Sequence, residues 1–256
     1  MTPLTLTPIR DVPLIQPGDD LPALILEGLK KSSLDIEDGD IIVVTQKIVS
    51  KAEGRLVNLT QVQVSERAKK YAAICEKDPR FVELVLQESN EVLRCRPGTI
   101  IVEHRHGFVC ANAGIDHSNV KGPWGNQEDW ELLLPKDPDV SAEKIRAFIQ
   151  AQTQKKIGVL IIDSHGRAWR IGTVGVCIGI AGFPAVVDMR GQSDMFGYKL
   201  RVTQVAAADE LAAAASLIMG QATEHIPVVH VHGFPYPLRE SHFPELVRPK
   251  DLDMFR

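Results

Sequence analysis

Two polar clusters in this chain have residue types that suit a site for a hard cation. The first is the end of Gly107–Asn119 (GFVCANAGIDHSN), where a Gly-Ile turn after an apolar strand presents Asp116. The second is Asp163–Arg170 (DSHGRAWR), where Asp163 directly follows the apolar run IGVLII. Two strands that each end in an aspartate are expected to bring both carboxylates to one rim. Paired carboxylates hold Mg²⁺ or Mn²⁺ and leave room for substrate phosphates.

Other chemistry is less well supported by the residues. A single aspartate at a strand end is often only a turn or capping residue. His104, His106, His117 and His165 invite a zinc interpretation, but the chain has neither an HExxH motif nor paired cysteines. It also lacks the GxxxxGK[ST] phosphate loop and the GxSxG nucleophile turn. The residues alone therefore indicate a cation-dependent enzyme that acts on an anionic substrate.

Lys47 and Lys51 lie four residues apart in TQKIVSKAEGR, beside hydroxyl and amide side chains that follow a predicted strand. Such a pair can hold phosphate groups. The alternative is an ordinary solvated face, where most lysines are found. Both interpretations remain open at this level.

The composition is that of a globular protein with a substantial core. The chain has 256 residues, 44% hydrophobic and 24% charged, with a net charge of −4, so neither nucleic acid nor an anionic membrane is an expected partner. The amino terminus lacks a signal-peptide core, and the longest uncharged run, Ile171–Val187, is too short for a membrane helix. The four cysteines are scattered, as in proteins with reduced thiols, so a cytoplasmic location is predicted.

The elements that must position these clusters follow from apolar patterns and turn signals. Asp19 or Asp20 is expected to cap a first helix, Ser65 one interrupted by Pro79, and Ser141 a third. The alanine-rich segment Val205–Met219 is the strongest helix and should end at Gly220. Predicted strands, in chain order, are a short one between Val12 and Pro17, then Ile41–Val44, Thr99–Glu103, Ile157–Ile162 and Val228–Val231. Loops are expected at 121–138 and 188–197, and the segment after Phe234 stays unassigned.

Several long motifs occur together and in order, among them PLIQPGDDL, DGDIIVVTQKIVSKAEGR, HGFVCANAGIDHSNV, DMRGQSDMFGYKLRVT and ADELAAAASLIMGQA. With DSHGRAWR, they make the chain resemble the coenzyme F420-0:L-glutamate ligases from about Pro13 to Gly233. The resemblance implies an α+β fold of mixed and antiparallel sheets with flanking helices, and two lobes intertwined in a homodimer. It also implies one ligase unit over residues 1–256, with residues 234–256 as a tail.

The activity implied by this resemblance is a GTP-dependent ligation. L-glutamate would be joined through a γ-linked amide to F420-0, and then to F420-1, by way of an acyl phosphate. Implied cofactors are Mg²⁺ or Mn²⁺ at two sites, and K⁺. A related amide ligase with another acceptor, a non-catalytic nucleotide-binding protein and a cation-dependent phosphatase are the alternatives.

Site residues are carried over from the resemblance position by position, and no catalytic base is among them. The cation ligands are expected to be Asp116, Asp163, Ser164 and Gln221. The GTP contacts are expected to be Leu14, Ile15, Gln16, Gln46, Lys47, Lys51, Asn119, Leu217, Ile218, Met219, Gly220, Gln221, Ala222, Thr223 and Glu224. The usual form of the second cluster is DTFGRPWR, so Ser164, His165 and Ala168 are departures. Ser164 keeps the hydroxyl, whereas His165 places an ionisable ring at an apolar position and leaves the acceptor open.

Overall fold

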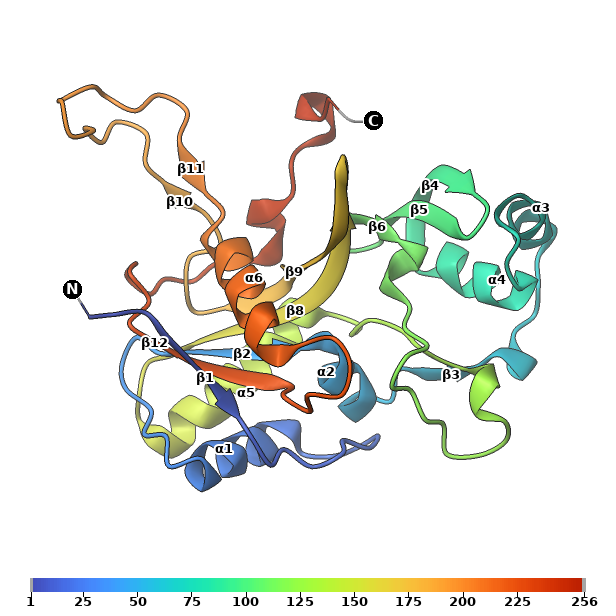
Figure 1. Cartoon of the computed structure of the whole chain (residues 1–256), viewed down its shortest axis with the longest axis horizontal. Helices are drawn as coiled ribbons and strands as arrows, with labels where there is room; N and C mark the ends of the chain where they lie inside the picture. The colour runs from blue at the N-terminus through green and yellow to red at the C-terminus, as the bar shows by residue number, and fades with distance from the viewer. Residues whose placement is uncertain (1, 255–256) are drawn as a thin grey trace.

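The computed structural model describes residues 2–254, and its centre is a mixed sheet of five strands. Its order is β1 (Thr5–Ile9), β12 (Val228–His232), β2 (Ile41–Thr45), β8 (Gly158–Arg167) and β9 (Arg170–Ala181). Strands β2 and β8 run parallel, and every other neighbouring pair in this sheet is antiparallel. β8 and β9 form a long curved hairpin that rises from the sheet (Figure 1).

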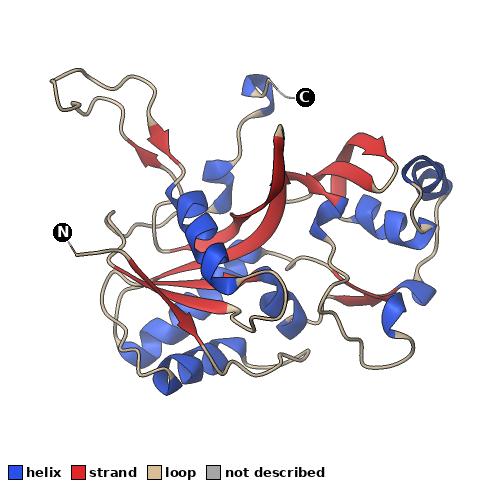
Figure 2. Ribbon diagram, viewed as in Figure 1, coloured by secondary structure: helices blue, strands red, loops and turns tan. Residues whose placement is uncertain are grey.

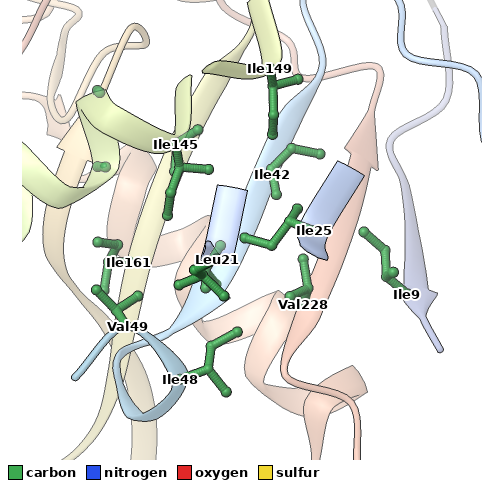
Figure 3. Close-up of a cluster of buried hydrophobic side chains, with 14 of the residues drawn as sticks. Ile9, Leu21, Ile25, Ile42, Ile48, Val49, Ile145, Ile149, Ile161 and Val228 are labelled. Atoms are coloured by element: carbon green, nitrogen blue, oxygen red, sulfur yellow. The ribbon is translucent and has the colours of Figure 1, made fainter. Parts of the chain in front are cut away.

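Helices cover both faces of this sheet, which explains why β2 is apolar from Ile41 to Val44 (Figure 2). Ile42 and Val44 point to the face covered by α1 (Leu21–Lys31) and α5 (Pro138–Thr153). Figure 3 shows Ile25 of α1 and Ile145 and Ile149 of α5 in that cluster. The alternate residues of β2 pack on the other side against α6 (Ala207–Met219). The parallel pair is thus buried from both sides.

A smaller group of elements lies beside the main sheet, to the right in Figure 1. It holds a three-stranded antiparallel sheet of β4 (Ser89–Arg96), β5 (Thr99–His104) and β6 (Val109–Ala111). Helices α3 (Glu66–Cys75) and α4 (Pro79–Gln87), short 3-10 turns and the ladder of β3 (Leu56–Asn58) with β7 (Trp130–Leu132) complete it. Helix α2 (Gln46–Ala52) leads from β2 toward this group. The α+β class with mixed and antiparallel sheets is confirmed.

Residues 187–205 form an arm that projects from the main body (Figure 1). β10 (Val187–Asp188) pairs with β11 (Gln204–Val205) at its base, and the predicted polar loop 188–197 lies beyond. Met195 and Phe196 at its far end are each 93% exposed. The final segment carries two 3-10 turns, Phe243–Leu246 and Lys250–Leu252. No helix within residues 2–254 is both long and apolar enough to span a bilayer.

Most of the predicted helix starts are confirmed. The Asp20 side chain accepts from the backbone N–H of Ala23 and caps α1, and the Ser65 hydroxyl accepts from Ala68 and caps α3. Pro79 separates α3 from α4, as expected. The prediction that Ser141 caps a helix is wrong. Asp137 caps α5 instead, because Pro138 suits the first helical position and needs no hydrogen-bond partner.

Several strand assignments differ from the prediction. The segment between Val12 and Pro17 is not a strand but an irregular segment, bounded by prolines that cannot donate to a ladder. The strand is instead Thr5–Ile9, which accommodates Pro8 because β1 lies at the edge of the sheet. β4 was also missed, because its mixed polar sequence has irregular register against β5.

The opposite edge of the main sheet, β9, is closed by side chains rather than by another strand. The Asp209 carboxylate accepts from the N–H of Cys177 at 2.9 Å. Asp139 accepts from the N–H of Ile180 at 2.8 Å with one oxygen and from the N–H of Phe243 with the other. These bonds satisfy donors that an edge strand would otherwise leave open. They also fasten α5, α6 and the final segment to β9.

Candidate functional site

A cavity of about 580 Å³ lies where the parallel strands β2 and β8 end. Its walls come from parts of the chain that are distant in sequence: the segment 12–15, the start of α2, the loop 116–121, β8 and the segment 216–227. Small-molecule sites in proteins commonly have volumes of about 300–1,000 Å³. The cavity is therefore large enough for a nucleotide-sized ligand.

Gln46 fixes one of the two predicted carboxylates. Its side chain is buried, and its amide oxygen accepts from the hydroxyl of Ser50 at 3.1 Å. That bond orients the amide so that Nε2 donates to Oδ2 of Asp116 at 2.6 Å. The backbone of Asp116 is held as well, through reciprocal hydrogen bonds with Leu132. Asp116 is thus held in place through both its side chain and its backbone.

The two lysines of α2 face the same loop. Lys47 Nζ lies 3.4 Å from Oδ2 of Asp116 and donates to the carbonyl and hydroxyl oxygens of Ser118. Lys51 donates to the carbonyl oxygen of Asn119 at 2.8 Å. Burial lowers the pKa of Lys51, and repulsion from Lys47 lowers it further. The ammonium groups of Lys47 and Lys51 lie close together without a full set of anionic partners. They therefore favour an anionic ligand in this cavity.

Asp163 lines the same cavity as Asp116, but not at a strand end. The prediction that β8 ends before it is wrong, because the chain continues to Arg167 as one arm of the β8–β9 hairpin. The pairing of β8 with β2 stops at Ile162, so Asp163 is the first residue beyond the parallel ladder. Its Oδ2 lies 3.0 Å from Nε2 of His165. His165, which departs from the usual motif DTFGRPWR, therefore contacts a predicted cation ligand.

The charges of the two aspartates repel each other in a half-buried place. Burial raises the pKa of Asp116, Lys47 lowers it, and the negative charge of Asp163 raises it again. A divalent cation would relieve this repulsion. The donors that line the cavity include carboxylate, hydroxyl and amide oxygens, which suit Mg²⁺ or Mn²⁺. The residues of this site fit such a cation.

Most of the predicted site residues lie at this cavity. Those that line it are Leu14, Ile15, Gln46, Lys47, Lys51, Asp116, Asn119, Asp163, Ser164, Met219, Gly220, Gln221, Ala222 and Glu224. Gln16, Leu217, Ile218 and Thr223 do not. Leu217 is 87% exposed on α6, and Ile218 packs against the core.

Sequence reasoning missed other lining residues, including Lys121, Thr173 and Ser216. Ser216 accepts from the side-chain amide of Gln221 at 3.3 Å and orients it. It is the one hydroxyl within an alanine- and leucine-rich helix, a signal that could have singled it out. Thr173 lies across the hairpin from Gly166, a pairing that needs the register of the strands.

The zinc interpretation gains no support. Within residues 2–254, no group of three or more His, Cys, Asp or Glu side chains is arranged to hold a metal. His104, His106 and His165 instead pack with Phe108 in an aromatic cluster. Any cation held by Asp116 and Asp163 would need further oxygen donors, from Ser164, Gln221, water or substrate.

Residues 10–233 match the F420-0:Gamma-glutamyl ligase family, a range that contains every wall of the cavity. The chain belongs to this family.

Similar proteins include a coenzyme F420:L-glutamate ligase of Methanothermobacter thermautotrophicus, 45% identical over 255 residues that cover 99% of both chains. A protein of the same name from Methanocaldococcus jannaschii is 45% identical over 222 residues, or 86% of each chain. Another, from Archaeoglobus fulgidus, is 44% identical over 250 residues, or 97% of this chain and 95% of that protein. The similarity to these F420-0:Gamma-glutamyl ligase family members thus spans both groups of elements.

Proposed function

We propose that this protein joins L-glutamate to coenzyme F420-0, and then to F420-1, through γ-linked amide bonds at the expense of GTP. The observation that carries the proposal is one cavity whose lining brings Asp116 and Asp163 together with Lys47 and Lys51, in a member of the F420-0:Gamma-glutamyl ligase family. The names of relatives that are 44–45% identical over most of the chain support the ligation. GTP, a divalent cation and K⁺ are parts of the proposal that the family resemblance suggests.

The chemistry follows from the weakness of a carboxylate as an electrophile. An oxygen of the acceptor carboxylate attacks the γ-phosphorus of GTP, and GDP leaves. The glutamate amine then attacks the acyl carbon, phosphate leaves, and the amine loses a proton. Such phosphoryl transfers depend on positioning and on neutralising charge.

The residues of the cavity have distinct roles in this scheme. Lys47 and Lys51 hold the phosphate groups by fixed positive charge, and Leu14 and Ile15 provide an apolar wall. Asp116, Asp163, Ser164 and Gln221 hold the divalent cations, which when bound offset the negative charge on the transferred phosphoryl group. Gln46 keeps the carboxylate of Asp116 oriented through its hydrogen bond. His165 orients Asp163 in the same manner.

We also propose that the active form is a homodimer. Large apolar side chains project on the arm and at the tip of the β8–β9 hairpin: Met195, Phe196, Val202, Trp169 and Ile171 are between 76% and 101% exposed. Such exposed apolar surface usually marks an interface. Leu217 on α6, next to the cavity, is exposed as well. Sedimentation equilibrium should give twice the chain mass, and a monomer at micromolar concentration would contradict this part.

The ligase proposal is tested by incubating F420-0 with GTP, L-glutamate and Mn²⁺ and measuring product mass. A gain of one glutamyl unit, with release of GDP, is expected. Asp163→Asn should remove this gain, while the control Asp35→Asn, an exposed aspartate outside the cavity, should retain it. GTP hydrolysis without glutamyl transfer would indicate a phosphatase. Nucleotide binding without turnover would indicate a binding protein.

A further inference from the structure

A second cavity, of about 280 Å³, lies at the edge strand β9 beneath the final segment of the chain. Its walls come from the turn around Phe108, the β8–β9 hairpin, the first turn of α6 and residues 243–253. At just below the usual range for small-molecule sites, about 300–1,000 Å³, it suits a ligand much smaller than a nucleotide.

Asp209 supplies a carboxylate to this cavity. One of its oxygens, Oδ1, accepts from the N–H of Cys177, and Oδ2 makes no hydrogen bond to any residue between 2 and 254. Burial raises the pKa of Asp209, and His165 opposes that rise. A half-buried carboxylate with one free oxygen suits a ligand cation such as an ammonium group.

Arg248 supplies the opposite charge. It lies at the exposed side of the same cavity, and it forms no ion pair or hydrogen bond within the described part of the chain. Phe108 and Phe243 make an apolar wall, with their rings edge to face at 5.6 Å. Asp253, from the same segment as Arg248, adds a second carboxylate to the lining. The carboxylate of Asp209, the guanidinium of Arg248 and the apolar wall together match a small zwitterion that carries methylene groups.

The second cavity adjoins the first through one pair of side chains. His165 lines the second cavity, Asp163 lines the first, and His165 Nε2 lies 3.0 Å from Asp163 Oδ2. A ligand bound at Asp209 would therefore share the second cavity with His165, and His165 contacts Asp163, a proposed cation ligand of the first cavity. An amide ligase needs its amine donor close to the activated carboxyl group.

We infer that the second cavity binds the amino-acid substrate, with the ammonium group at Asp209 and a carboxylate at Arg248. This inference rests on the proposed ligase function and names the amino-acid subsite of that reaction. An amino acid with a second carboxylate, such as L-glutamate, places its methylene groups along the wall formed by Phe108 and Phe243.

The test compares Asp209→Asn and Arg248→Gln with wild type. Asparagine keeps an oxygen for the N–H of Cys177, and Arg248 is exposed, so both variants should fold. Arg96→Gln, an exposed arginine on β4 outside both cavities, is the matched control. Thermal unfolding verifies the fold of each. Titration calorimetry with L-glutamate, in the presence of GDP and Mn²⁺, measures the dissociation constant, and steady-state assays give the KM values for L-glutamate and GTP.

Loss of one charge-assisted contact should raise the L-glutamate dissociation constant and KM at least about tenfold in both cavity variants. The KM for GTP and all constants of Arg96→Gln should stay unchanged. If wild type forms product and the variants bind L-glutamate as wild type does, the inference is wrong and the ligase function stands. If L-glutamate binds and both variants weaken it, but no product forms, the subsite stands and the ligase function fails. Absence of L-glutamate binding to wild type also overturns the inference.

Discussion

Replacing Asp116 by asparagine should separate the activity of the protein from its stability. Substitutions in the outer shell of a metal site typically reduce activity or metal affinity by about 10–100-fold, so a direct ligand should lose at least about 100-fold, or ~2.7 kcal/mol. Asparagine keeps an oxygen that accepts from Gln46, so the loop should keep its position. The assay is the turnover of F420-0 at saturating GTP and Mn²⁺.

The fold should not be weakened by this change. The pair of Asp116 with Lys47 is lost, but both side chains are about a quarter exposed, so it contributes about 0.2–1 kcal/mol. Against that, asparagine removes a negative charge that desolvation and the neighbouring charge of Asp163 disfavour, as the raised pKa of Asp116 indicates. We therefore expect the variant to be at least as stable as wild type, by thermal unfolding, when no cation is added.

The pH dependence gives a sharper version of the same prediction. Because the folded pKa of Asp116 is raised, its favourable contribution is complete below the unfolded pKa, about 3.9, and is lost as pH rises through the folded pKa. The advantage of Asp116→Asn over wild type should therefore grow between about pH 4 and pH 7 in the presence of a chelator. A variant that is active, or clearly less stable than wild type at pH 7, would refute the reasoning; Asp35→Asn is the control.

Three further predictions concern other parts of the structure. Lys51→Met should weaken GDP binding about tenfold, because one fixed positive charge is lost. Calorimetry measures the GDP affinity, and Lys31→Met on α1 is the control. Equal GDP affinities of the two variants would contradict a role of Lys51 in phosphate binding. Gly175→Ala should destabilise the protein by about 1–3 kcal/mol in urea unfolding, because its Cβ would lie 2.5 Å from the carbonyl oxygen of Ala212, whereas Gly166→Ala in the same hairpin has open space and should be nearly neutral. Burial would raise the pKa of Asp40, but hydrogen bonds from His230, the N–H of Glu37 and His232 lower it, and Asp40 in turn raises the pKa of His232. The Asp40 contribution is lost as pH falls below about 4 and the His232 contribution as pH rises above about 6.5, so His232→Gln should destabilise the protein more at pH 5.5 than at pH 8.5. A difference that is independent of pH would exclude this role.

The parts of the fold that were predicted correctly are those whose local pattern matches their burial. β2 is apolar from Ile41 to Val44 because both faces are covered there, and α6 is rich in alanine and leucine. Pro79 and Ser65 were assigned correctly because their effects on a helix act within one turn. Ser141 was a wrong choice because an equally good cap, Asp137, stands directly before a proline.

For the site, sequence reasoning indicated many of the residues that line the cavity, but not the strand pairing and contacts that position them. The matching contexts of Asp116 and Asp163 indicated that they share a cavity, and they do. The continuation of β8 to Arg167 depends on its pairing with β9, which a pattern of glycines and polar residues does not reveal. The contact of Gln46 with Asp116 joins residues 70 positions apart, and the final segment acquires a role only by covering β9. Such relations arise from tertiary packing and have no local signal.

The carboxylates of Asp139 and Asp209 prevent a further strand from pairing with β9 at this edge of the main sheet. An incoming strand would need the N–H groups of Cys177 and Ile180 as donors, and both already have acceptors within the chain. Lateral growth into fibres through this margin is therefore suppressed in the native state, even at high protein concentration. On this side of the sheet, self-association would instead have to use side chains, such as the exposed Met195 and Phe196 of the protruding arm.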